Sequence, residues 1–205
     1  MAFLTQHDSS HPDALMRPMQ GFRSKLARAV WQFSWTVFCR LTPNPMHRWR
    51  CFVLRIFGAQ LGKNNFIYPS ARIWAPWMLE TGDVATIASN ASIYNVGGIF
   101  IGHHAIISEG VYLCGATHDF QDPDFPLMSQ RIEIGPYAWI CARAIVLPGV
   151  TCGEGSVLGA GAVCAKDLKS WTVYAGNPAR EVKSRKPFDN AGSSNSPDNP
   201  NGEDL

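Results

Sequence analysis

The stretch IGHHAIISEGVYLCGATH, residues 101–118, consists of three six-residue units that begin at Ile101, Ile107 and Leu113. The same period continues on both sides, with units starting at Leu61, Ile67, Ile73, Thr81, Ile87, Ile93, Ile134, Ile140, Val146, Cys152 and Leu158. Twelve of these fourteen units open with Ile, Leu or Val, and twelve have a small fifth residue. A helix repeats every three or four residues and a two-sided strand every two, so this period indicates neither.

A six-residue period instead predicts a coil of three short parallel strands per turn. Each opening aliphatic residue then points inward and stacks on its counterpart about 4.8 Å above. Interruptions follow Met78, Gly98 and His118, each time after a third unit, so all of them fall at one corner of the prism. We therefore predict a mainly β protein, a parallel β-helix of about five coils over residues 61–165, with the loop 119–133 projecting from one edge.

The segment before the coil, residues 22–60, is basic and rich in aromatic residues. We predict that this segment is helical and that the helix is interrupted at Thr42-Pro43-Asn44-Pro45, because proline disrupts a continuing helix. Four apolar residues share one helical face, and this face is expected to cap the open end of the coil: Trp31, Trp35, Phe38 and Cys39. The remaining boundaries predicted are an N-terminal arm (1–21), a C-terminal extension with a short helix (166–186) and a disordered tail (187–205).

The net charge of +2 hides an asymmetry. Residues 14–79 contain ten Lys or Arg and no Asp or Glu, whereas the rest of the chain has eight basic and sixteen acidic residues. A basic, aromatic surface of this kind can rest on an anionic membrane. Capping of the coil and peripheral membrane contact are compatible, so both remain open.

Composition places the chain among globular proteins: 205 residues, 46% of them hydrophobic, suffice for a single core with appendages. The polar start MAFLTQHDSSHPD does not resemble a signal peptide, and Arg28, Gln32 and Arg40 interrupt the most apolar stretch, so no transmembrane helix is expected. The six cysteines form no CxxC pair, which favours reduced thiols, no metal and a cytoplasmic location, with possible attachment to the inner face of the membrane. No nucleic-acid partner is expected.

Four runs carry a family resemblance: SIYNVGG (92–98), ISEGVYLCGATHDF (107–120), AWICARAIVLPGVTCGEGSVLGAGAVCAKDL (138–168) and YAGNPAR (174–180). Over residues 55–186 the chain resembles the hexapeptide-repeat acyltransferases. More narrowly, it resembles the sugar acetyltransferases of the colanic-acid-biosynthesis type, close to the maltose and galactoside acetyltransferases. The resemblance implies a left-handed coil, acetyl-CoA as co-substrate, and a homotrimer in which one chain supplies a histidine and its neighbour part of the cofactor groove.

His118 is the candidate catalytic residue. Acetyl transfer to a hydroxyl needs a base, and an imidazole suits this role because its unperturbed pKa is about 6.5. His118 ends the ninth unit where the long loop departs, and it matches the histidine that is the general base in the resembling enzymes. The other histidines are more simply surface residues: His7, His11, His47, His103 and His104.

Asn95 lies one coil before His118 on the same face of the predicted prism. An asparagine in a similar position contacts the acceptor in the maltose and galactoside enzymes, although Asn95 could equally form a corner turn before two glycines. Asp119, Asp122 and Asp124 give the loop negative charge, and Asp119 is a candidate for binding sugar hydroxyls or orienting His118. Ordinary solvation of this loop is the simpler explanation.

The resemblance also implies a cofactor track. Trp139 would lie near the acetyl group, where it could touch the acceptor as well, and the track continues along Ala142, Ala160, Ala165, Lys166, Arg180 and Lys183. The three cations suit the phosphates of coenzyme A. Simple solvent exposure is the alternative for each of them.

These observations favour an acetyl-CoA-dependent O-acetyltransferase that acts on a sugar or a lipid-linked glycan in exopolysaccharide or capsule synthesis. His118 would activate the hydroxyl for direct attack. Two alternatives are a non-catalytic trimeric β-helix used for assembly or ligand sensing, and an enzyme like the β-helix carbonic anhydrases. The latter needs three converging histidines, and the spacing from His103 and His104 to His118 offers no third partner.

Overall fold

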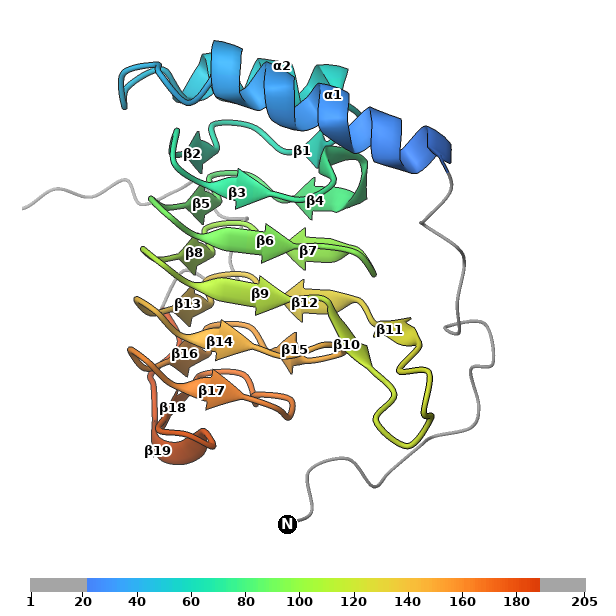
Figure 1. Cartoon of the computed structure of the whole chain (residues 1–205). Helices are drawn as coiled ribbons and strands as arrows, with labels where there is room; N and C mark the ends of the chain where they lie inside the picture. Colours follow the sequence, from blue (N-terminus) through green and yellow to red (C-terminus); the bar gives the residue numbers. More distant parts are fainter. Residues whose placement is uncertain (1–21, 189–205) are drawn as a thin grey trace, which may run out of the picture.

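The computed structural model describes residues 22–188 as a column of short strands crossed at one end by two helices, α1 (Phe22–Phe38) and α2 (His47–Ile56) (Figure 1). The predicted arm, with His7 and His11, and residues 189–205 of the predicted tail lie outside the described residues. Among residues 22–188, neither helix is both long and apolar enough to cross a bilayer.

The column has three faces, each a parallel sheet. The first face stacks β1 (Gln60–Leu61), β4 (Leu79–Thr81), β7 (Ile99–Ile101), β12 (Ile132–Ile134) and β15 (Thr151–Cys152). The second stacks β2 (Phe66–Ile67), β5 (Thr86–Ile87), β8 (Ile106–Ile107), β13 (Trp139–Ile140), β16 (Val157–Leu158) and β18 (Thr172–Ala175). The third stacks β3 (Arg72–Ile73), β6 (Ser92–Tyr94), β9 (Tyr112–Cys114), β14 (Ile145–Val146) and β17 (Val163–Cys164).

The opening residues of the repeat form ladders inside the column. On the second face Ile67 pairs with Ile87, which pairs with Ile107, and Ile107 pairs with Ile140. All four are at most 1% exposed. Burying such a side chain contributes about 1.5–3 kcal/mol relative to leaving it in water, so this repeated ladder is the main source of the core's stability. The predicted parallel β-helix is thereby confirmed.

The column has about six turns rather than five. Cys152 bridges to Leu168 on the first face, and β18 continues the second face below β16. Leu168 and Tyr174 fill the interior there, although neither opens a unit of the six-residue pattern.

Glycine follows the opening residue where the corners between the first and second faces stack. A Cβ on Gly102 would lie 2.5 Å from the backbone nitrogen of Pro136, and one on Gly135 would lie 2.7 Å from that of Glu154. Successive turns approach too closely at this corner for any side chain. The recurrence of Gly in the repeat therefore reflects close backbone contact between turns.

The helices cover the end of the column above β3. Trp31, Trp35 and Cys39 are buried, and the two indoles donate hydrogen bonds to the carbonyl oxygens of Ile73 (2.7 Å) and Ala71 (3.1 Å). The inclusion of Phe38 in this buried face was wrong. Phe38 is 53% exposed, because α1 ends at this residue and the chain turns away towards α2.

The predicted short C-terminal helix is also wrong. Residues 172–184 form a hairpin of β18 and β19 (Arg180–Ser184), which turns through the cis Asn177-Pro178 bond. Val173 and Tyr174 pair with Val157 and Leu158 of β16, so this segment prolongs the second face. A helix at this position would forfeit the ladder hydrogen bonds that β16 offers.

Candidate active site

A two-stranded ribbon projects from the corner between the third and first faces. It consists of β10 (Ala116–His118) and β11 (Leu127–Ser129), which pair antiparallel with His118 opposite Leu127 (Figure 1). The predicted loop 119–133 is therefore only partly irregular: residues 119–126 form the connection, and the chain then returns through β11 to β12.

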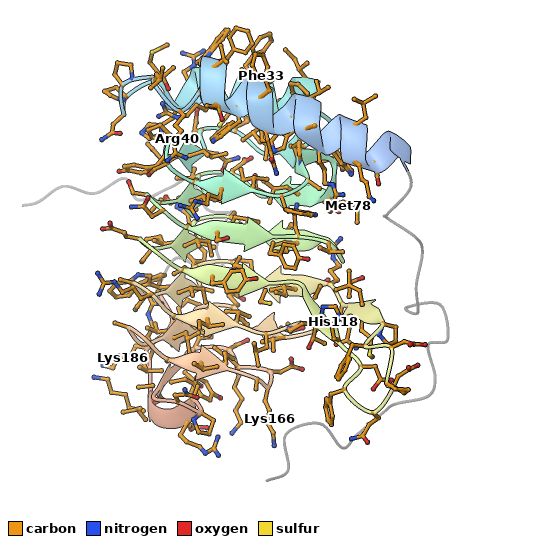
Figure 2. The ribbon with its side chains drawn as sticks, viewed as in Figure 1. Phe33, Arg40, Met78, His118, Lys166 and Lys186 are labelled. Atoms are coloured by element: carbon orange, nitrogen blue, oxygen red, sulfur yellow. The ribbon has the colours of Figure 1, made fainter. Side chains whose placement is uncertain are left out.

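His118 stands at the base of this connection with its side chain exposed (Figure 2). Its Nδ1 lies 2.6 Å from the carbonyl oxygen of Phe125. A carbonyl oxygen only accepts hydrogen bonds, so Nδ1 carries the proton and Nε2 keeps its lone pair in the neutral ring. The loop thus orients His118 as a group that can take a proton at Nε2.

Aspartate side chains hold the loop in shape. The Asp119 backbone N–H donates to the carbonyl oxygen of Pro126 (3.0 Å), and the Asp119 carboxylate accepts from the backbone of Gln121 (2.9 Å). Asp122 accepts from the backbone of Asp124 in the same way (2.9 Å). The orienting partner of His118 is accordingly the Phe125 carbonyl, while Asp119 keeps one carboxylate oxygen outside these bonds.

The predicted contact of Asn95 with the acceptor stays a prediction, and the structure gives this side chain a structural role inside the column. Asn95 is fully buried: its Oδ1 accepts from the Ala75 N–H (3.0 Å), and its Nδ2 donates to the Ala75 carbonyl oxygen (2.7 Å). Asn65 uses its Oδ1 similarly, accepting from Ala85 (2.7 Å). These amides replace ladder hydrogen bonds between neighbouring turns, and Asn95 is shielded from solvent inside the column of a single chain.

The predicted cofactor residues lie in two separate regions. Trp139 lies on the second face, 46% exposed, and donates to the Ser108 hydroxyl (2.9 Å). Ala142 and Ala160 are exposed at the corner between the second and third faces, where the Gly161 N–H donates to the Ala142 carbonyl oxygen (2.9 Å).

Below that corner, Arg180 and Lys183 extend from the exposed strand β19. Ala165 and Lys166 instead follow β17 at the corner from which the His118 ribbon leaves, two turns further down (Figure 2). A single chain therefore brings His118, Ala165 and Lys166 to one corner and keeps Ala142 and Ala160 at another.

Sequence reasoning missed the Phe125 carbonyl and the Ser108 hydroxyl. Every residue type has a backbone carbonyl, so the sequence cannot single out the one at Phe125. Ser108 occupies an ordinary outward position of the repeat. Only the three-dimensional path of the loop and the pairing of β8 with β13 reveal them.

Within residues 22–188, no three His, Cys, Asp or Glu side chains gather as a metal site would require. His104 stacks on Tyr137, with ring centroids 5.1 Å apart, and His103 packs edge-on against the same ring. That cluster lies where the first and second faces meet, at a different corner from His118.

A parallel β-helix built from hexapeptide repeats, with a loop that orients an exposed histidine, is the arrangement that the resemblance to the hexapeptide-repeat acyltransferases predicts. No protein-family model matches the chain. It is 40% identical over 169 residues to the putative colanic acid biosynthesis acetyltransferase WcaF of Escherichia coli K12, an alignment that covers 81% of this chain and 92% of that protein. The chain belongs to the hexapeptide-repeat acetyltransferase family and is an acyltransferase.

Solved structures agree with the left-handed β-helix predicted for the fold. The hexapeptide-repeat acetyltransferase VCA0836 of Vibrio cholerae, solved with acetyl coenzyme A, superposes with a TM-score of 0.75 at 21% identity, covering 85% of this chain and 95% of that one. A maltose O-acetyltransferase of Clostridium difficile 630 gives 0.72 at 24% identity, covering 82% and 91%.

Proposed function

We propose that the protein transfers an acetyl group from acetyl-CoA to a sugar hydroxyl during exopolysaccharide or capsule assembly. The 2.6 Å contact between His118 Nδ1 and the Phe125 carbonyl oxygen carries the proposal, since it leaves Nε2 available as a base. The Vibrio structure with acetyl coenzyme A supports the donor. The Clostridium maltose O-acetyltransferase and the relative named for colanic acid biosynthesis support the sugar acceptor.

In the proposed reaction, His118 Nε2 takes the hydroxyl proton while the sugar oxygen attacks the thioester carbonyl carbon. The developing imidazolium is stabilised by the Phe125 carbonyl oxygen through Nδ1–H. When the C–S bond breaks, His118 returns the proton to the sulfur. The acetyl group thus passes directly from sulfur to the sugar oxygen, the proton passes from the hydroxyl to the sulfur, and no covalent enzyme intermediate forms.

The separation of the predicted residues supports a homotrimeric site. In a closed ring of three chains, the first face of each chain can pack on the second face of its neighbour. This packing brings the His118 corner of the first chain to the Ala142–Ala160 corner of the neighbour. The second face suits such burial, because Phe66, Ile106 and Trp139 leave 43%, 43% and 46% of their surfaces exposed in a single chain.

The vertical order of the residues supports a track for coenzyme A. Trp139 and Ala142 lie one turn below the level of His118, Ala160 lies two turns below it, and Arg180 and Lys183 come after the last turn. At about 4.8 Å per turn, the cations lie roughly 15–20 Å beyond the acetyl end, far enough for an extended pantetheine arm. Lys166 would reach the same track from the neighbouring chain.

The test is thiol release from acetyl-CoA with a panel of free sugars, nucleotide-sugars and lipid-linked glycans. We expect turnover with one class, and a drop of about 10²-fold or more in kcat for His118→Ala. His47→Gln, on the capping helix α2 and away from both corners of the proposed site, is the matched histidine control and should keep wild-type turnover. Wild-type turnover by a folded His118→Ala trimer would refute the proposed base, and acetyl-CoA binding without turnover on any acceptor would favour the non-catalytic assembly or sensing role.

A further inference from the structure

The helix α1 carries a second apolar stripe on the side opposite its buried tryptophans. Leu26, Val30, Phe33 and Val37 follow the spacing i, i+4, i+7 and i+11, and they are 54%, 49%, 69% and 46% exposed. Phe33 lies on the outer surface of the helix, away from the column (Figure 2). A helix that only capped the column would present polar residues on this side.

The helix α2 continues this outer surface. Trp49, Phe52 and Ile56 follow the spacing i, i+3 and i+7, and each is at least 39% exposed. The Trp49 indole donates to the Phe38 carbonyl oxygen (2.8 Å) and lies 5.8 Å from the Phe52 ring. The exposed side chains of the two helices thus form one apolar surface, called here the outer stripe: Leu26, Val30, Phe33, Val37, Phe38, Trp49, Phe52 and Ile56.

The charge around the outer stripe has a single sign. Lys25, Arg40, Arg48 and Arg55 are exposed on or beside the two helices, although the Arg55 guanidinium donates to the carbonyl oxygens of Leu61 (3.3 Å) and Gly62 (2.7 Å) of the column. No Asp or Glu occurs between residues 14 and 79. None of these four cations forms an ion pair with an acidic side chain of the described chain. An apolar surface bordered only by cations is complementary to the interface of an anionic bilayer, where aromatic rings enter the headgroup region and cations meet lipid phosphates.

We infer that the outer stripe docks the protein on an anionic lipid surface, with the column standing away from the bilayer. A second copy of this chain is a poorer occupant, because two such surfaces would face each other with like charge. The ribbon that carries His118 leaves from β9, two turns below β3, so it lies about 10 Å further from the capped end than β3 does. This geometry suits an acceptor sugar attached to a membrane lipid. In the trimer proposed above, on which this last step rests, three caps would face the same bilayer and reinforce binding.

The test is sedimentation of the full-length protein with vesicles of phosphatidylcholine containing about 30% phosphatidylglycerol, compared with phosphatidylcholine alone. We expect an apparent affinity at least about tenfold higher for the anionic vesicles, and loss of most binding between about 50 and 500 mM NaCl. The variant Phe33→Glu/Phe52→Glu should abolish binding. The control Gln32→Glu/Thr36→Glu adds the same charge to exposed positions beside the outer stripe, leaves the stripe intact, and should retain most of the binding.

Three results would overturn the inference: no binding, equal binding to both kinds of vesicle, or equal loss in both double variants.

Binding that appears only after removal of residues 1–20 would instead assign the outer stripe to the chain's own N-terminal arm. A vesicle-independent doubling of mass that Phe33→Glu abolishes would assign it to a second copy. Vesicle binding does not depend on acetyl transfer, so turnover on a soluble sugar, measured in parallel, distinguishes failure of docking from failure of the proposed enzyme.

Discussion

Arg50 donates its Nε hydrogen to the carbonyl oxygen of Ile67 at 2.6 Å, and this contact ties α2 to the first turn of the β-helix. The guanidinium is fully buried, and no carboxylate of residues 22–188 forms an ion pair with it. Its other donors reach the Thr42 hydroxyl (2.7 Å) and the carbonyl oxygens of Pro43 (3.0 Å) and Asn44. Burial lowers the pKa of Arg50 from its ordinary value, yet the surrounding carbonyl oxygens satisfy the charged group.

Replacing Arg50 with methionine should therefore lower the free energy of unfolding by about 3 kcal/mol, because several buried acceptors lose their donor together. Thermal unfolding at fixed protein concentration measures the effect. Arg48→Met is the matched control, since Arg48 is exposed on the same helix and its loss should cost less than about 0.5 kcal/mol. Equal unfolding midpoints for the two variants would contradict a structural role for the buried guanidinium.

Asn95→Ala should act on stability rather than on the acceptor. The variant leaves the N–H and carbonyl of Ala75 without partners, which costs about 2 kcal/mol or more. Steady-state kinetics should show an unchanged KM for the acceptor once the protein is folded. Asn65→Ala removes a similar amide bond at a different corner, so a raised acceptor KM in the Asn95 variant alone would support the predicted substrate-binding role.

Gly102→Ala tests the close stacking of the turns. Its added methyl group would meet the Pro136 backbone at 2.5 Å, and separating the turns to admit it should cost about 2–3 kcal/mol. Gly161→Ala is the comparison: no atom in the described part of the chain lies within 4 Å of its Cβ position, and only the strain of its positive φ remains, about 1 kcal/mol. Chemical denaturation measures the free energy of unfolding of both variants. A lower free energy of unfolding for the Gly161 variant than for the Gly102 variant would contradict the close stacking of the turns at Gly102.

The fold was predictable because every six-residue unit has the same pattern, an inward aliphatic residue and a small residue at the corner. The prediction failed where this pattern ends. The last turn buries Leu168 and Tyr174, which do not follow the pattern, and the segment expected to be helical forms β18 and β19.

Polar residues were harder to predict than the ladder, because the role of each depends on partners distant in sequence. Asn95 is bonded to Ala75 one turn earlier, and Arg50 is bonded to Ile67 across the cap. His118 was proposed as the base through its motif, whereas the carbonyl oxygen that contacts its Nδ1 could be identified only from the path of the loop.

The proposed sharing of the site between chains makes a quantitative prediction about mixed trimers. His118→Ala removes the base, and Ala160→Trp blocks the exposed corner of the cofactor track. Each homotrimer should be inactive. Equal co-expression of the two chains should restore about a quarter of the wild-type sites, because a site is complete when one neighbour supplies an intact histidine and the other an intact corner.

The matched control places both substitutions in one chain and co-expresses it equally with the wild type. A site between chains again gives about a quarter of full activity, whereas a site within one chain gives about half. A site within one chain also predicts no activity for the mixture of single variants. Mass determination first confirms that the mixed trimers assemble, and activity per trimer then separates the two arrangements. Activity near zero for the mixed single variants, together with about half for the double variant mixed with wild type, would place His118 and the Ala142–Ala160 corner in a site within one chain.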